Sequence, residues 1–181
     1  MRLNTAYLGV AAAMLFAGCA TSSAVNQSRD PIMLMMSDGS QLRYERDIRV
    51  ISAAVPGTPV GLWPALNAEY MTLNLPVTQR DSSEYALAAQ NAQFNGRFGD
   101  GPVSRVVDCG LTPLAAPRAN AYKVWITVVS QLQPAASGSV LRTSVTAKAQ
   151  DPNSSSSAIQ CGSTGALEAD IARALGGSTS N

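Results

Sequence analysis

Three cysteines, Cys19, Cys109 and Cys161, are the residues of this sequence with the widest chemical range. Their chemistry is constrained because the sequence contains no histidine. Without imidazole, no Ser–His or Cys–His pair can activate a nucleophile, and the commonest metal ligand is missing. The sulfur atoms can still form a disulfide or carry a covalent group. We therefore predict no catalytic residue, no metal site and no cofactor, and a protein that is not an enzyme.

Spacing and charge argue against two further kinds of site. Gly99-Asp100-Gly101 lacks the third glycine of a dinucleotide loop, and neither Lys123 nor Lys148 follows the glycine pattern of a phosphate-binding loop. The 13 basic and 12 acidic side chains give a net charge of +1, which leaves no basic field for nucleic acid. Asp108 is interpreted as a solvated carboxylate at a strand end.

The residues up to Cys19 have the composition of an export signal. Arg2 and the terminal amine give a short positive start, and residues 6–16 form an apolar run. This run has about half of the ~20 residues that a membrane-spanning helix needs, which is typical of a signal peptide. It ends in Leu-Phe-Ala-Gly-Cys at positions 15–19. The junction resembles the lipobox of bacterial lipoproteins, with Phe16 where that motif prefers leucine.

The lipobox resemblance implies a diacylglyceryl group on the Cys19 sulfur, cleavage before Cys19, and a further fatty acid such as palmitate on the new amine. Several acyl chains together hold a protein durably at a bilayer. Ala20 is not the aspartate associated with inner-membrane retention, so we expect the outer membrane, facing the periplasm. The alternative is an ordinary cleavable signal that contains a cysteine. The expected organisation is a signal peptide at 1–18, a tether at 19–30, one domain at 31–177 and a tail at 178–181.

The other two cysteines, Cys109 and Cys161, lie in similar surroundings. Each ends a short strand-like run and is followed by glycine. Export places the chain in an oxidising compartment, where two cysteines of a small domain usually pair. We predict a Cys109–Cys161 disulfide between strand ends that lie side by side; two free buried thiols are the alternative. Closing a loop of about 50 residues should stabilise the fold by about 4 kcal/mol.

The first half of the mature chain predicts a hairpin followed by a helix. Residues 32–36 are apolar, Asp38-Gly39 is a strong hairpin signal, and residues 42–50 alternate as a second strand. Prolines and a glycine at 56–59 end that strand. Residues 60–73 then have helical spacing, and Pro64 is expected in or near the first helical turn, where its missing donor costs little.

The second half predicts mostly antiparallel strands. Residues 77–98 remain open between helix, which Tyr85–Gln90 favours by propensity, and extended structure. Residues 122–132 and 141–149 alternate as an antiparallel pair with one buried and one solvated face. Ser163 or Thr164 is expected to cap a final helix. The predicted buried face of that helix is Leu167, Ile171, Ala174 and Leu175, with Gly176-Gly177 as its stop. The fold class is therefore α+β, an antiparallel sheet with both helices packed on one face.

Two groups of large side chains allow two interpretations each. Trp63, Tyr70 and Trp125 can line a ligand cavity under the first helix, but core packing explains them more simply. Met33, Met35 and Met36 can form an adaptable docking strip, but an edge strand that packs on the sheet is the simpler explanation.

Residues 46–175 resemble the helix-grip-like domains of small bacterial lipoproteins, of which the BamC-type outer-membrane assembly proteins are the familiar case. The resemblance rests on a strand that closes at Pro56-Gly57-Thr58-Pro59, on Leu62-Trp63-Pro64-Ala65-Leu66 opening a helix, and on the helix after the last strand. It implies a fold and transfers no binding residue. Two functions are expected: a non-catalytic interaction or assembly-accessory protein of the envelope with a protein partner, or, alternatively, a carrier of a small apolar ligand.

Overall fold

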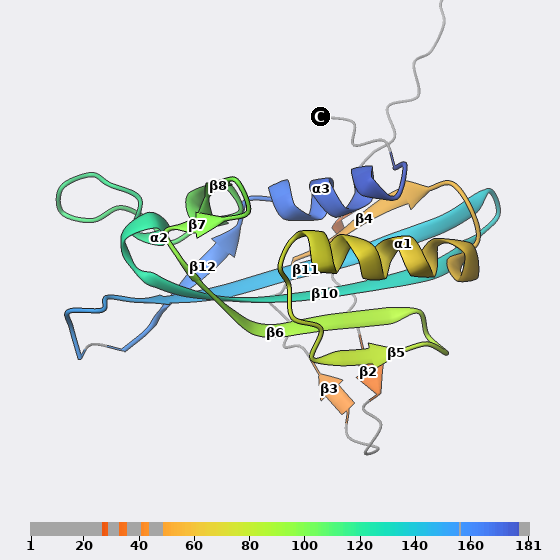
Figure 1. Cartoon of the computed structure of the whole chain (residues 1–181), viewed down its shortest axis with the longest axis horizontal. Helices are drawn as coiled ribbons and strands as arrows, with labels where there is room; N and C mark the ends of the chain where they lie inside the picture. The colour runs from red at the N-terminus through yellow and green to blue at the C-terminus, as the bar shows by residue number, and fades with distance from the viewer. Residues whose placement is uncertain (1–26, 29–32, 36–40, 44–48, 156, 178–181) are drawn as a thin grey trace, which may run out of the picture.

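The structure is a computed structural model that describes residues 27–28, 33–35, 41–43, 49–155 and 157–177 (Figure 1). Within these ranges no helix is both long and apolar enough to cross a membrane. Cys19, the predicted signal peptide and the predicted tail lie outside the described residues. The elements in chain order are β1 Gln27–Ser28, β2 Met33–Met35, β3 Gln41–Arg43, β4 Val50–Val55, α1 Pro59–Thr72, β5 Gln79–Asp81, β6 Ala86–Asn95, β7 Arg97–Phe98, β8 Gly101–Pro102, the 3-10 helix η1 Val103–Arg105, β9 Val107–Asp108, α2 Arg118–Ala121, β10 Lys123–Ala135, β11 Gly138–Gln150, β12 Ile159–Ser163 and α3 Ala166–Ala174.

The main sheet is built around the long hairpin of β10 and β11. These strands pair without interruption from Lys123–Gln150 to Ala135–Gly138. Neighbouring strands follow in the order β1-β4-β11-β10-β6-β5, and β12 joins β11 beyond the end of β4. All of these pairings are antiparallel. The α+β class predicted from the sequence is confirmed.

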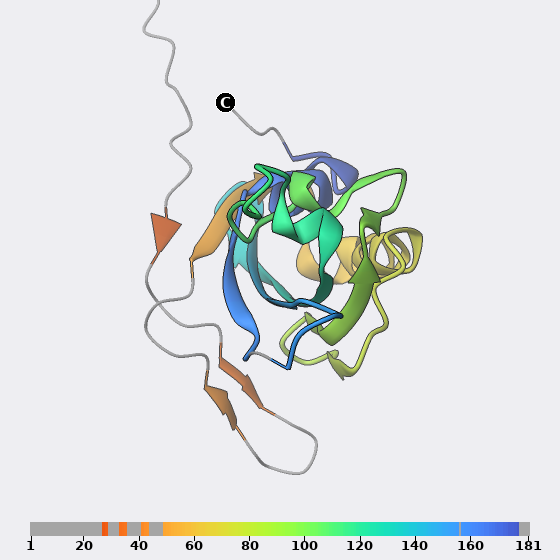
Figure 2. The same ribbon diagram turned by 90° about the vertical axis from the view of Figure 1, so that its left-hand side faces the viewer.

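Both longer helices, α1 and α3, lie on the same face of this sheet, which curls around them (Figure 2). The space between helices and sheet is filled by side chains that are essentially inaccessible to water. Tyr70 of α1 also donates its buried hydroxyl to Ser130 Oγ at 3.0 Å, and Ser130 and Thr143 hydroxyls are 3.1 Å apart. The largest apolar members of this core are Phe98, Leu66, Leu87, Ile126, Leu132, Leu141, Leu167 and Ile171.

Helix α1 begins earlier than the sequence predicts. Thr58 is its N-cap and accepts the Gly61 N–H at 3.3 Å, and Pro59 occupies the first turn, where proline is tolerated. Pro64 consequently lies inside the helix, so the prediction of Pro64 in or near the first turn is wrong. Pro64 is exposed, so water can bond the helix carbonyl that its missing N–H leaves free.

The segment 77–98, which the sequence leaves open, is extended. Strand β6 pairs with β10 on one side and β5 on the other. A bulge interrupts the β6–β10 register, where the Asn91 N–H bonds to Thr127 Oγ1 at 3.0 Å and Asn91 has a φ of 50°. Pairing on both sides outweighs the helix propensity of the alanines.

Two further expectations, both about residues before β4, need correction. Residues 42–50 are not one strand, because Leu42 belongs to β3, which pairs with β2, whereas Val50 begins β4 in the main sheet. The predicted tether overlaps the sheet, because β1 pairs with β4 through Gln27–Ile51 and Ser28–Val50. The β2–β3 hairpin itself is confirmed.

Helix α3 also differs in detail from its prediction. Its N-cap is Gly165, which has a φ of 88°, so neither Ser163 nor Thr164 is the cap residue. Thr164 Oγ1 nevertheless accepts the Ala166 N–H at 3.3 Å. Ala172 is buried in place of Ala174, which is exposed because the helix turns that side toward water.

Candidate interaction surface at the disulfide

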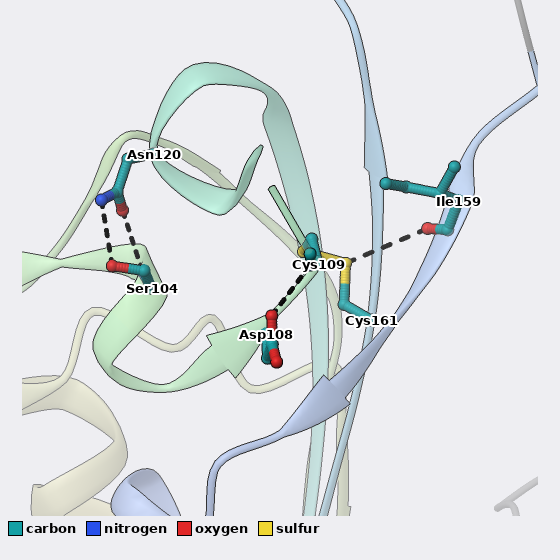
Figure 3. Close-up of a disulfide and its surroundings, with 7 residues drawn as sticks. Ser104, Asp108, Cys109, Asn120, Ile159 and Cys161 are labelled. Carbon is teal, nitrogen blue, oxygen red and sulfur yellow. Dashed lines mark hydrogen bonds between the residues drawn. A yellow bond between two sulfur atoms is a disulfide. The ribbon is translucent and has the colours of Figure 1, made fainter. Parts of the chain in front are cut away.

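Cys109 and Cys161 form a disulfide with an S–S distance of 2.07 Å (Figure 3). Cys109 directly follows β9, and β9 pairs with β12 through Asp108–Gly162 and Val107–Ser163. Cys161 is the middle residue of β12, so the prediction that both cysteines end a strand is wrong for Cys161. The Cα atoms are 4.3 Å apart and the two cysteines are 52 residues apart in sequence. The structure therefore joins the two cysteines that the sequence predicts to pair.

Directly after Cys109 the chain forms a tight turn. The Gly110 N–H donates to Asp108 Oδ1 at 2.8 Å, and Gly110 adopts a φ of 74°, which glycine tolerates best. The Gly110 carbonyl in turn accepts the Arg118 N–H at 2.9 Å. Asp108 thus acts as a turn acceptor, and the two ends of the intervening segment are hydrogen-bonded to each other.

Residues 111–117, which we call the apolar loop, lie between these two ends. Thr112 organises the loop: its N–H donates to the Ala116 carbonyl at 2.8 Å, its carbonyl accepts the Ala115 N–H at 2.9 Å, and its Oγ1 accepts the Ala116 N–H at 3.2 Å. Leu111 and Pro117 form an isolated bridge at the base. The loop is therefore an ordered structure with its own hydrogen bonds.

The side chains of the apolar loop face solvent. Leu114 is 92% exposed and Leu111 58% exposed, and the loop contains no ionisable residue. The loop projects from one end of the molecule beside α2 (Figure 1). Single exposed apolar residues are common, but two exposed leucines on one loop of defined conformation make that loop a candidate interaction surface. Burying Leu114 in a partner would contribute roughly 1.5–3 kcal/mol.

A second set of contacts fixes the side of the loop opposite the disulfide. The Ser104 N–H donates to Asn120 Oδ1, and Asn120 Nδ2 donates to Ser104 Oγ, both at 2.9 Å (Figure 3). This pair ties α2 to η1. Ala119 of α2 is buried in the core. The loop is thus held at the disulfide on one side and at α2 on the other.

The three aromatic residues that the sequence suggests as a cavity lining, Trp63, Tyr70 and Trp125, do not surround a common space. Tyr70 is buried under α1, and Trp63 makes an edge contact with Tyr85 at 5.9 Å. Trp125 belongs to the other face of the sheet, where the Lys148 ammonium lies 5.7 Å from its ring centroid. Core and surface packing therefore account for all three.

A pair of acidic residues on α3 has opposite electrostatic surroundings. Burial raises the pKa of Glu168, and the hydrogen bond that Ser163 Oγ donates to it at 2.7 Å only partly opposes this. Burial also acts to raise the pKa of Asp170, but hydrogen bonds and charge from Arg105, at 2.6 Å, and Arg173, at 2.8 Å, outweigh it, so that pKa is lowered. Ser163 thus donates its hydroxyl to a buried carboxyl group on α3.

The described residues hold no cluster of three or more cysteine or acidic side chains that could bind a metal ion. A scan against protein-family models finds no match, and searches of curated proteins and of solved structures find none either. Sequence reasoning overlooked the apolar loop and the buried Glu168. The loop has a sequence signal, two leucines among prolines and alanines with no strand or helix pattern, directly after a cysteine.

Proposed function

We propose that this chain is a non-catalytic envelope lipoprotein, anchored through lipid on Cys19, whose domain binds another envelope component. The observation that carries the proposal is the apolar loop. Its leucines are exposed and its conformation is fixed by the Cys109–Cys161 disulfide. A disulfide that persists only in an oxidising compartment agrees with export. The anchor itself is supported by the lipobox resemblance alone.

The packing beneath α1 favours this function over transport of an apolar ligand. Leu66 and Tyr70 have no exposed surface and belong to one apolar cluster with Ile126 and Leu141. The hydroxyl of Tyr70 is bonded to Ser130 rather than aimed at an open space. A carrier needs room at this position, whereas an interaction domain gains stability from filling it.

Site-specific crosslinking in intact cells tests the interaction. A photoreactive amino acid at Leu114 should give a discrete adduct with one envelope component, and Leu111→Ser should weaken that adduct. Met71 of α1 is the matched control, because it is 76% exposed but lies outside the loop. Absence of an adduct at position 114, or equal adducts at positions 71 and 114, would contradict the proposed role of the loop.

Fatty-acid labelling tests the anchor separately. Cys19→Ser should abolish incorporation of labelled palmitate and leave the precursor uncleaved, and fractionation of the unmodified protein should place it in the outer membrane. Labelling that persists in Cys19→Ser would contradict the anchor. Saturable, tight binding of a fatty acid, together with protection of the fold against heat, would favour the carrier function instead.

A further inference from the structure

A continuous row of small side chains crosses the face of the sheet that points away from α1 and α3. The register places Val50 of β4 beside Ser144 of β11, Ser144 beside Val129 of β10, and Val129 beside Ala88 of β6. We call these four residues the outer row. They are only 0–3% exposed, although they lie on the opposite face of the sheet from the core under the helices.

This burial requires a covering layer. Lys148 of β11 lies on the same face as Ser144 and is exposed, so the part of this face around Lys148 is open to water. Both longer helices pack on the opposite face and cannot shield the outer row. Val50, the first residue of β4, is itself a member of the outer row.

The β2–β3 hairpin is on the correct side to provide this cover. In both views it lies on the side of the sheet away from α1 and α3 (Figures 1 and 2). Strand β1, which comes just before it, extends the outer row by pairing Ser28 with Val50. The sequence of residues 32–36 is entirely apolar.

We propose that the β2–β3 hairpin packs face to face on the outer row and forms a second layer of the fold. Alanine, serine and valine at the row leave space for larger side chains from a covering strand, and sheets that stack in this way lie about 10 Å apart. Strand β2 is then part of an internal packing layer. The row is a binding site for this chain's own N-terminal region, independent of the apolar loop.

Thiol accessibility in the full chain tests the proposal. In a protein that carries Cys19→Ser, Ala88→Cys provides the only unpaired thiol, and Lys148→Cys provides a matched control on the exposed part of the same face. We expect alkylation of the folded protein at position 88 to be at least tenfold slower than at position 148. Near-ultraviolet circular dichroism confirms that each variant retains its packed core.

Charged residues introduced into the β2–β3 hairpin test whether this hairpin is the layer that covers the outer row. Side chains alternate along a strand, so Met33→Asp with Met35→Asp changes one face of the hairpin, and Leu34→Asp with Leu42→Asp changes the other. At least one of these double variants should accelerate alkylation at position 88 by tenfold or more without affecting position 148. Fast alkylation at position 88 before any hairpin change would overturn the proposal. Slow alkylation at position 88 that neither double variant accelerates would also overturn the proposal. If that slow rate then depends on protein concentration, a second copy of the chain is what covers the outer row.

Discussion

Removal of the disulfide, by changing both Cys109 and Cys161 to alanine, should destabilise the domain by about 4 kcal/mol. The value follows from the 52-residue separation of the two cysteines, because an unfolded chain without the crosslink gains the entropy of that closed loop. A loss of this size is a large fraction of the 5–15 kcal/mol that stabilises a typical domain. With a slope of roughly 2 kcal/mol per molar urea, the unfolding midpoint should fall by about 2 M.

The loss should be uneven along the chain. Only two residue pairs connect β9 with β12, so the disulfide is the main constraint on the end of β9 and on the apolar loop that follows it. The β10–β11 hairpin has its own long register and does not depend on the crosslink. Amide hydrogen exchange in the double variant should therefore accelerate most in residues 107–121 and least in β10 and β11.

Urea denaturation followed by tryptophan fluorescence, with exchange measured by mass spectrometry, checks both expectations. Wild-type protein treated with a reductant is the control, because it should reproduce the double variant without any change of side chain. A destabilisation below about 1 kcal/mol, or equal acceleration of exchange throughout the domain, would refute the reasoning that the disulfide closes an entropically costly loop and fixes this end of the molecule.

Three further changes probe other parts of the fold. Leu66→Ala should lower the free energy of unfolding by about 2–5 kcal/mol, as measured in urea, because its fully buried side chain fills the contact between α1 and the sheet. Glu168→Gln should remove one contribution to the pH dependence of stability. Because the pKa of Glu168 is raised, the contribution of its protonated form is fully present below the ordinary value of 4.5 and is lost as the pH rises through the folded-state pKa. The difference between the thermal melts of wild-type and variant protein should therefore grow from pH 4 to pH 8. Gly138→Ala should cost about 1–3 kcal/mol in a thermal melt, because Gly138 has a φ of 117° and an added Cβ would lie 2.7 Å from the Val55 carbonyl oxygen; unchanged melting of this variant would contradict the turn geometry.

The parts of the fold that the sequence predicts well are those set by local patterns. Strands β10 and β11 alternate apolar and polar side chains over many residues, and this pattern is a direct consequence of strand geometry. The Cys109–Cys161 pairing could likewise be inferred, because the sequence around each cysteine is similar and the expected oxidising compartment favours a disulfide.

The parts that could not be predicted depend on tertiary contacts. The alanines of β6 favour a helix locally, and only pairing with β10 and β5 makes the segment a strand. The exposure of Leu114 has no local cause either, because leucine is more often buried than exposed. It results from the position of the loop at one end of the molecule, which the disulfide and α2 determine together.

The pairing of β1 with β4 has a consequence for how far the domain can travel from a membrane. Gln27 already belongs to the main sheet, so only residues 20–26 lie between it and Cys19. A fully extended chain spans about 3.5 Å per residue, so this connection reaches at most ~28 Å. A lipid on Cys19 would therefore keep this edge of the sheet within about 28 Å of the bilayer surface.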